Sequence, residues 1–341
     1  TMSTTATSRY SFYLIATITA AGAIFSAVLM TEPGQSLALP RSWTVGYYRY
    51  RWLFIGLNLG LLAILWYLHA RFRLWSRVWM GLASLGVALC MFAANFLLGL
   101  LFPSAQYQAN YVSVGEADAL LNDADIVYAV EINNEVRGYP RSHLEIPHIA
   151  GDTIGGKNVA MTFCALSNLP VVIEQDMGLD EPSDLGILIQ THNNLVMVER
   201  NSGELIQQIT MQPEFSDANI VTYPNTMMSW RHFKHAYPNA EVFIYPSDRA
   251  MDRLLKAVFA EPMKKQFDPD QGAIFPTLDM QDQRLNAKEQ VWGFDNGTTQ
   301  LAFTRAFARD NPVYHFELDG LPLVLVYDEQ YEVVNLFDAQ L

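Results

Sequence analysis

Residues 78–102 read VWMGLASLGVALCMFAANFLLGLLF, a stretch of 25 residues with no Asp, Glu, Lys or Arg. A helix rises about 1.5 Å per residue, so this stretch can cross a hydrocarbon core of about 30 Å. Residues 10–30 and 52–70 also lack these charged residues, and each stretch has at least 19 residues. We therefore predict a three-helix transmembrane region within residues 1–103, followed by a globular domain over residues 104–341.

The first of these stretches also fits a cleaved signal peptide. Only Arg9 precedes it as a positive charge, and two further spans follow, which favours a retained helix. No ionisable residue lies well inside a span, since His69 is near an end. Ionisable residues inside the membrane mark most ion and proton pathways, so the sequence does not indicate a transporter.

Arginine residues set the expected orientation in the membrane. The short loop between the second and third spans carries Arg71, Arg73 and Arg77. After the third span no Lys or Arg occurs until Arg137. The positive-inside rule therefore predicts a cytoplasmic arginine loop and a globular domain on the opposite, extracytoplasmic side of the membrane. The first loop argues the other way, because it also has arginines, namely Arg41, Arg49 and Arg51.

The two parts of the chain differ in charge. Residues 1–102 hold seven basic residues and one acid, a net charge of +6. Residues 103–341 hold 15 basic and 34 acidic residues, a net charge of −19. A domain this acidic repels nucleic-acid phosphates, so nucleic acid is excluded as a partner. The expected partners are the lipid bilayer and other subunits of a membrane complex.

The globular domain is predicted to be mainly β, of the α+β class. Its first part alternates short apolar strands with turns, at 126–130, 135–139, 159–163 and 170–174. Asn133-Asn134 is typical of a hairpin turn. Two helices are expected, one capped by Asn225 or Thr226 and ending near Ala236, and a second over residues 253–259.

Residues 290–338 repeat the pattern of residues 126–174 at an offset of 164. The register holds without a gap for about 50 residues, and aligned pairs include Val127 with Val291 and Arg141 with Arg305. Few aligned residues are identical, so shared β-propensity is the alternative explanation. We predict an internal duplication of a β-rich unit. Because Asp328 stands where the first half has Cys164, we expect any chemistry to lie in the first half.

Several phrases occur in order over most of residues 110–338: Asp152 to Gly156, then Val159 to Cys164, then Asn194 to Met197 and Ser202-Gly203. In these the chain resembles the bacterial family catalogued as domain of unknown function 3179. The resemblance implies a domain and no particular activity. Many members pair two cysteines three residues apart at the strand end. This chain has Cys164 and then Ser167, which removes the second thiol that a dithiol redox centre requires.

Cys164 is the first candidate site residue. A thiol at a strand end is a metal ligand or nucleophile if a nearby group lowers its pKa, and otherwise behaves as a small buried apolar residue. The order of the chain brings His148 towards it, although a lone His is more often structural. Asp152 and Ser167, beside the same strand, are candidate ligand-binding residues.

Thr191-His192-Asn193-Asn194 is a polar cluster between two strands. It forms either a site rim, with His192 as base or ligand and Asn193 and Asn194 as donors, or a plain β-turn, where Asn is favoured. The pair His232 and His235 lacks a third ligand, so a solvated helix face is expected there.

Two functions remain open. The first is a non-catalytic accessory or assembly subunit of a membrane complex, because no complete catalytic motif occurs. The second is a periplasmic metal-binding or redox protein in which Cys164, His148 and His192 bind a transition metal such as copper or zinc.

Overall fold

The computed structural model describes residues 2–176, 182–268, 272, 275–277, 281–286 and 288–339. The chain divides into two compact units. The helical unit comprises Thr1–Pro103, Gly186–Asp217 and Ile274–Leu278, and the β unit comprises Ser104–Leu185, Ala218–Ala273 and Asp279–Leu341. Residues 186–217, which the sequence analysis assigned to the globular domain, thus pack with the helices.

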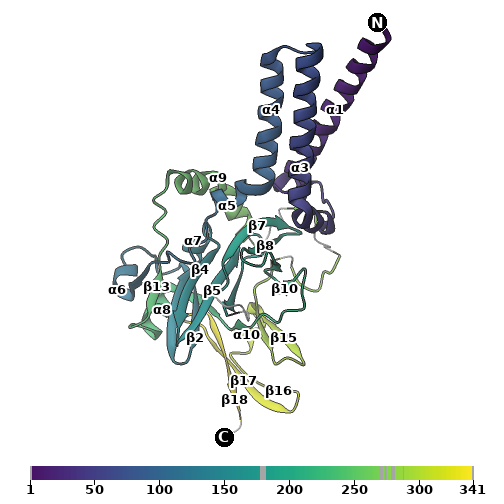
Figure 1. Cartoon of the computed structure of the whole chain (residues 1–341). Coiled ribbons are helices and arrows are strands. Elements are labelled where there is room, and N and C mark those ends of the chain that lie inside the picture. Colours follow the sequence, from purple (N-terminus) through teal and green to yellow (C-terminus); the bar gives the residue numbers. More distant parts are fainter. Residues whose placement is uncertain are drawn as a thin grey trace. The chain divides into compact units, whose positions relative to one another are not determined.

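Long apolar helices make up most of the helical unit (Figure 1). Their bounds are α1 (Met2–Leu29), α2 (Glu32–Ser36), α3 (Arg41–Phe72), α4 (Arg77–Phe92), the π-helical turn η1 (Ala93–Leu97) and α5 (Leu98–Leu101). Within the described residues, three helices are long and apolar enough to cross a membrane, over Thr7–Leu29, Arg41–Phe72 and Arg77–Leu101. The prediction of three apolar helices at the N-terminus is therefore confirmed, although the second helix begins at Arg41 and not at the start of the uncharged stretch 52–70.

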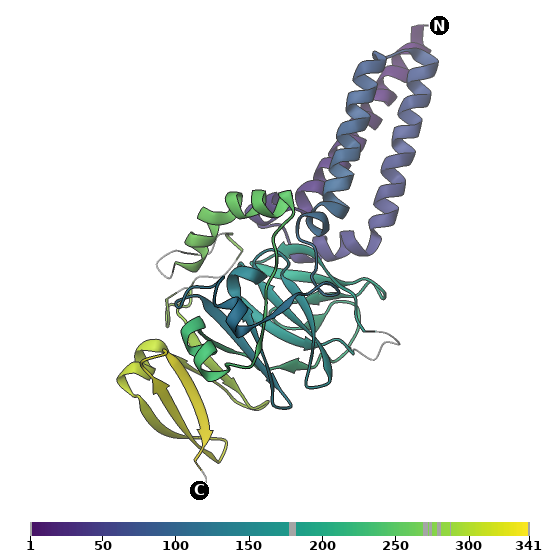
Figure 2. The ribbon, with the colours of Figure 1, turned by 90° about the vertical axis from the view of Figure 1, so that its left-hand side faces the viewer.

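Helix α3 is longer than a bilayer requires and bends near its start. Tyr50 has non-helical backbone angles, with φ −108° and ψ 16°. The first turns therefore run in a different direction from the rest of the helix (Figure 2). From Arg51 to Phe72 the helix has 22 residues, which gives about 33 Å and matches a hydrocarbon core. The first turns carry Trp43, Tyr47, Tyr48 and Tyr50, and such aromatic side chains suit the interfacial layer of a membrane.

A small sheet completes the helical unit. Its strands lie in the order β10-β9-β8-β7, where β7 is Leu185–Thr191, β8 is Asn194–Glu199, β9 is Leu205–Gln207 and β10 is Gln212–Pro213. Its apolar side chains share one core with the helices, which contains Ile189, Val196 and Leu205 from the strands and Leu29, Met30, Tyr47, Tyr48 and Ala94 from the helices. This sheet therefore forms its core against the helices.

The helices of this unit alternate in direction. Phe12 near the start of α1 packs against Trp75 in the α3–α4 loop, with ring centroids 5.2 Å apart. The core shared with the sheet forms at the opposite end of the bundle, around Leu29 and Tyr47 (Figure 1). The loop with Arg71, Arg73 and Arg77 thus lies at the end of the helices away from this sheet.

Two sheets form the main body of the β unit. One has the order β1-β13-β3-β2-β12, with β1 Tyr111–Ser113, β2 Ile126–Ile132, β3 Glu135–Pro140, β12 Thr226–Ser229 and β13 Glu241–Phe243. The other has the order β11-β6-β5-β4, with β4 Ile149–Ile154, β5 Lys157–Cys164, β6 Leu169–Glu174 and β11 Thr222–Tyr223. The helices of this main body are α6 (Val114–Ala117), α7 (Arg141–Leu144), α8 (Trp230–Ala236) and α9 (Ala250–Phe267).

The core of this body joins both sheets. Tyr128 and Tyr139 from the first sheet pack with Phe163 and Val172 from the second, and all four are almost fully buried. The hairpin between β2 and β3 turns at Asn133 and Asn134, with φ values of 51° and 65°. This confirms the predicted Asn-Asn turn, because Asn tolerates left-handed backbone.

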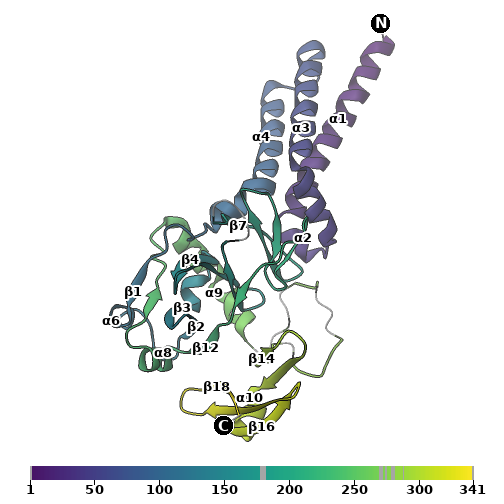
Figure 3. The ribbon, with the colours of Figure 1, turned by 60° about the horizontal axis from the view of Figure 1, so that its bottom comes forward.

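The last part of the β unit holds β14 (Val291–Asp295), β15 (Gln300–Thr304), α10 (Arg305–Asp310), β16 (Val313–Leu318), β17 (Leu321–Asp328) and β18 (Val333–Asp338) (Figure 3). β14 pairs with β15, and β16-β17-β18 form an antiparallel sheet. Aromatic side chains fill the core between them, among them Phe303, Tyr314 and Phe316. We call residues 290–338 the C-terminal module.

Two predicted helices have different bounds in the structure. Residues 226–229 form the edge strand β12, and the helix begins only at Trp230, capped by the Ser229 hydroxyl, which accepts from the His232 N–H. The cap prediction at 225–226 was wrong because Thr226–Ser229 pairs with β2, and tertiary pairing overrides a weak capping signal. Helix α9 runs to Phe267, well past the predicted end at 259.

Candidate functional site

Cys164 ends strand β5 and is completely buried. The turn that follows is enclosed by helix α9, because the Gln266 side-chain amide donates a hydrogen bond to the Leu166 carbonyl. The Ser167 hydroxyl oxygen is buried, and among the described residues no hydrogen-bond partner for it is found. The predicted pair of positions 164 and 167 thus lies in an enclosed turn.

His148 lies beside the same strand. The Phe163 N–H donates to the His148 carbonyl at 2.7 Å, which places His148 opposite the neighbour of Cys164. Its ring Nδ1 is 3.1 Å from the Ile146 carbonyl and donates to it. Burial lowers the pKa of His148 to about 4, so the ring is neutral at pH 7.

The polar cluster at residues 191–194 forms the turn between β7 and β8. His192 and Asn193 both have positive φ, at 52° and 55°, which is the geometry of a two-residue hairpin turn. The Thr191 hydroxyl lies 3.1 Å from His192 Nδ1. Burial and the charge of Arg41 lower the pKa of His192. The backbone of this cluster therefore has the conformation of a β-turn, one of the two alternatives that the sequence left open.

The two Asn amides of this cluster brace neighbouring segments. Asn193 donates to the Phe275 carbonyl at 3.1 Å and to the Thr277 hydroxyl at 2.8 Å. Asn194 donates to the Gln207 side-chain oxygen at 2.8 Å and accepts from the Ile209 N–H at 3.1 Å. Asn194 therefore ties β8 to β9 and the residues after it, whereas Asn193 ties the β7–β8 turn to residues 275–277.

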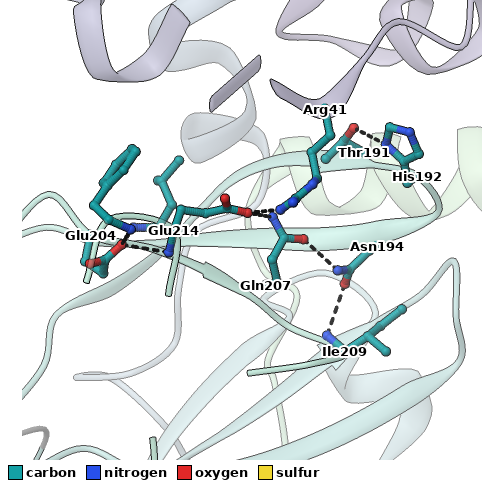
Figure 4. Close-up of polar contacts among 10 residues, drawn as sticks. Arg41, Thr191, His192, Asn194, Glu204, Gln207, Ile209 and Glu214 are labelled. Atoms are coloured by element: carbon teal, nitrogen blue, oxygen red, sulfur yellow. Dashed lines mark hydrogen bonds and ion pairs between the residues drawn. The ribbon is translucent and has the colours of Figure 1, made fainter. Parts of the chain in front are cut away.

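A chain of polar contacts links this sheet to the start of helix α3 (Figure 4). Arg41, the first residue of α3, forms an ion pair with Glu214, and Gln207 also donates to the Glu214 carboxylate at 2.5 Å. Through Gln207 the chain reaches Asn194. Sequence reasoning missed Glu214. The signal was Arg41 itself, a positive charge on a loop where the charge rule did not expect one.

Asp152 lies in a buried ionic cluster of the β unit. Its carboxylate accepts from the Tyr139 hydroxyl at 2.8 Å and pairs with Arg137 at 3.1 Å. Arg137 also pairs with Glu135 at 2.8 Å and with Glu241 at 2.9 Å. Burial raises the pKa of Asp152, while the Tyr139 hydroxyl and Arg137 oppose that rise. Arg137 and Tyr139 were not singled out from the sequence, although a charge inside strand 135–139 was a visible signal.

The three predicted metal ligands fall in different units. Cys164 and His148 belong to the β unit and His192 to the helical unit. Over the residues that the structure describes, no group of three or more His, Cys, Asp or Glu side chains could hold a metal ion. His232 and His235 both lie against the Tyr331 ring, with centroids 4.3 and 5.8 Å away.

A cavity of about 500 Å³ opens in the β unit, between β12 and the C-terminal module. This volume lies in the range of small-ligand sites. Its walls include apolar side chains, two arginines and several acids; they are Ile126, Met227, Met228, Val291, Trp292, Tyr331, Arg231, Arg305, Asp123, Glu329 and Glu332. None of these residues was singled out as a site from the sequence.

The family described as Protein of unknown function (DUF3179) matches residues 102–341, which is well over half of the chain. The chain belongs to this family. The DUF3179 match starts at the end of the third apolar helix and includes residues 186–217, whose strands share a core with the helices. Comparisons with curated proteins and with solved structures gave no significant match.

The DUF3179 phrases that carried the resemblance fall in two places of the fold. Residues 152–164 form β4, β5 and the turn between them, beside the ionic cluster of Asp152. Residues 194–203 form β8 and the following turn, within the helical unit. In that turn Glu199, which is buried, accepts from the Ser202 N–H and hydroxyl, both at 2.6 Å. The sequence motifs shared with DUF3179 therefore correspond to particular strands and turns of the fold.

Proposed function

We propose that this DUF3179 protein is a membrane-anchored accessory or assembly subunit of a membrane protein complex. The observation that carries the proposal is the core shared by strands β7–β9 and the apolar helices. Leu205 and Val196 are buried against Tyr47 and Leu29, so part of the DUF3179 domain folds on the helices themselves. Helices that only tethered the domain to the membrane would not need to share a core with it. In a subunit that contacts neighbouring membrane proteins, the shared core fixes strands β7–β9 relative to the helices.

The apolar helices also offer faces for other helices. Gly56 and Gly60 lie four residues apart on α3, and a Cβ added at either would meet no atom within 4 Å. A Cβ added at Gly81 or Gly86 on α4 would also meet no atom within 4 Å. Small residues four apart, as Gly56 and Gly60 are, allow helices to approach closely in lipid. These open faces favour contacts with helices of a partner.

We also propose that the globular domain lies on the periplasmic side of a bacterial inner membrane. The loop with Arg71, Arg73 and Arg77 lies at the end of the helices away from the sheet β7–β10, which supports a cytoplasmic loop. The arginines that argued against this orientation have partners beside that sheet. Arg41 pairs with Glu214, and the Arg49 guanidinium lies 5.1 Å from the centre of the Phe215 ring.

We further propose that residues 126–174 and 290–338 are copies of one β-rich unit. Strands β16, β17 and β18 begin and end 164 residues after β4, β5 and β6. The strand pairings follow the same offset, since Val159 faces Glu174 as Leu323 faces Asp338. A loop contact also repeats, because the Tyr327 N–H donates to the Pro312 carbonyl as the Phe163 N–H donates to His148.

The matching strand lengths and pairing register support the proposed copies over shared β-propensity, because propensity specifies neither. The interiors of the two copies differ. Phe303 and Phe316, with ring centroids 5.3 Å apart, occupy the positions equivalent to Tyr139 and Asp152. The scaffold is thus repeated while the ionic cluster belongs to the first copy alone among the described residues.

Native sizing of the chain after gentle detergent extraction from its own membrane tests the proposed function. We expect a particle larger than one 38.5 kDa chain with its detergent. Gly56→Leu with Gly60→Leu should reduce it to the single chain without unfolding it, because both positions are open. Gly46→Leu, in equally open space before the bend of α3, is the matched control and should leave the particle intact. A single chain in wild-type extracts would contradict the proposal.

The side of the membrane has its own test. A reporter fused to the C-terminus should be reachable by an impermeant reagent from the periplasm. Access from the cytosol alone would refute the proposed orientation.

A further inference from the structure

The cavity in the β unit is bordered by two strands whose outer edges carry no partner among the described residues. β12 is the last strand of its sheet and pairs inward with β2, with Met228 opposite Val127. β14 pairs inward with β15, with Trp292 opposite Phe303. Residues 227–229 and 290–292 both line the cavity. An edge strand exposes unpaired backbone N–H and C=O groups, so two sets of such groups border one space.

Side chains around the cavity fit an apolar segment. Met227, Met228 and Trp292 form apolar parts of its wall. Methionine adapts its shape to different partners. The cavity therefore offers an adaptable apolar surface to a bound chain.

The charges around the cavity favour a basic partner. Its two arginines are engaged, since Arg305 pairs with Glu332 and Arg231 donates to the Gln330 carbonyl at 2.5 Å. Glu329, also on the wall, is exposed. The C-terminal module has eight acidic and two basic residues, a net charge of −6. Such a field attracts basic segments and disfavours a second copy of the same acidic module.

The first copy of the repeat shows what such an edge accepts. Strand β2 is the counterpart of β14, and its outer edge is filled by β12 in antiparallel register, with Met228 opposite Val127. The equivalent of Val127 in the second copy is Val291, which is 41% exposed and borders the cavity. The scaffold thus accepts an added antiparallel strand at this position.

We propose that the cavity binds an extended segment of a partner polypeptide, with alternating apolar and basic side chains, which adds as a strand to the outer edge of β14. This inference rests on the proposed assembly role in that it names the kind of segment a partner would supply. Main-chain hydrogen bonds to the strand edges would give affinity, and the Met and Trp pocket would select the apolar side chains.

Peptide binding to the full chain in mild detergent tests this proposal. The probe is a short fluorescein-labelled peptide that alternates valine and lysine. A peptide with glutamate in place of lysine tests the charge preference, and a backbone N-methylated version tests strand addition, because it lacks N–H donors. We expect saturable binding of the lysine peptide, and at least about tenfold weaker binding of both other peptides.

Two matched variants locate the binding. Val291→Lys places a positive charge at the cavity and should weaken the lysine peptide at least about tenfold. Val313→Lys changes another exposed valine of the same module, 59% exposed against 41% for Val291, which lies outside the cavity, and it should leave binding unchanged. Met227→Lys, on the opposite edge, is a second test and should act like Val291→Lys.

The proposal is overturned if the lysine peptide does not bind, if N-methylation has no effect, or if the two valine variants behave alike. Equal binding of the glutamate peptide would overturn the basic character of the partner. Native sizing separates this inference from the proposed function. If the chain runs as a single copy but binds the peptide, only the proposed assembly role is contradicted. If it runs as a larger particle but does not bind the peptide, only the present inference is contradicted.

Discussion

Replacing the buried ionic cluster of the first copy by the residues of the second copy is the sharpest test of the proposed repeat. The triple variant is Arg137→Leu, Tyr139→Phe and Asp152→Phe. These substitutions install the side chains of Leu301, Phe303 and Phe316, which lie 164 residues further on in a working apolar core. If the two copies share one scaffold, the triple variant folds.

The structure sets the expected size of the effects. Arg137 and Asp152 side chains are only 11% and 6% exposed, so removal of one partner leaves a buried charge. Breaking a buried pair in this way costs about 3–5 kcal/mol, whereas replacing the whole pair by apolar residues is often close to neutral. Arg137 keeps Glu135 and Glu241, which are 42% and 52% exposed. Asp152→Phe alone should therefore cost about 3 kcal/mol, at the low end.

Thermal unfolding of the full chain in detergent, followed by intrinsic fluorescence, measures both variants. A loss of about 3 kcal/mol lowers Tm by about 6–12 °C in a domain of this size. We expect that shift for Asp152→Phe and a shift under about 4 °C for the triple variant, which corresponds to about 1 kcal/mol. A triple variant less stable than Asp152→Phe would refute the interchange of cores and, with it, this support for the repeat.

Three further predictions concern single positions. The pKa of His148 is about 4 in the folded chain and about 6.5 in the unfolded chain, so the unfolded state binds the proton first as the pH falls. The free energy of unfolding should therefore decrease by about 2 kcal/mol between pH 7 and pH 5. In urea unfolding, His148→Asn should lose this part of the pH dependence, because Asn tolerates the left-handed backbone of this position and does not titrate. Cys164, fully buried, should react with a maleimide only after denaturation, and fast labelling of Cys164 itself in the native chain, distinguished from Cys90 by peptide mass spectrometry, would contradict its burial. Gly151→Ala would place a Cβ 2.2 Å from the Gln106 carbonyl oxygen, so it should destabilise the chain by more than about 1 kcal/mol in thermal unfolding, and an unchanged Tm would contradict that close approach.

The apolar helices and the strand-rich domain were predictable because their signals are local. Uncharged stretches of bilayer length indicate membrane helices, and Asn133-Asn134 between apolar runs indicates a hairpin. The bend at Tyr50 was not predicted, because the span was assigned from the uncharged stretch 52–70 alone, which gives no information about the residues before it. The structure of residues 226–229 could not be predicted from the local sequence, because it is determined by pairing with the distant strand β2.

The packing of residues 186–217 on the helices could not be predicted, because the partners of Leu205 lie more than a hundred residues away in sequence. The candidate site residues lie in different surroundings, which the sequence indicated to different degrees. His148 does lie beside the strand of Cys164, as chain order suggested. Asn193 bonds to Thr277 and Asn194 to Gln207, and neither distant partner can be read from the sequence around these residues. The cavity at Trp292 was invisible in sequence because two distant strand edges create it.

Hydrogen exchange measured on the full chain and on residues 104–341 alone tests the central claim, that strands β7–β9 fold on the membrane helices. In the full chain the amides of Val196 and Leu205 should be protected, because both residues are buried in paired strands. Without the helices we predict that this protection is lost, while amides of the β5 strand, such as Met161, stay protected. Equal protection of residues 194–207 in both chains would contradict a core shared with the helices.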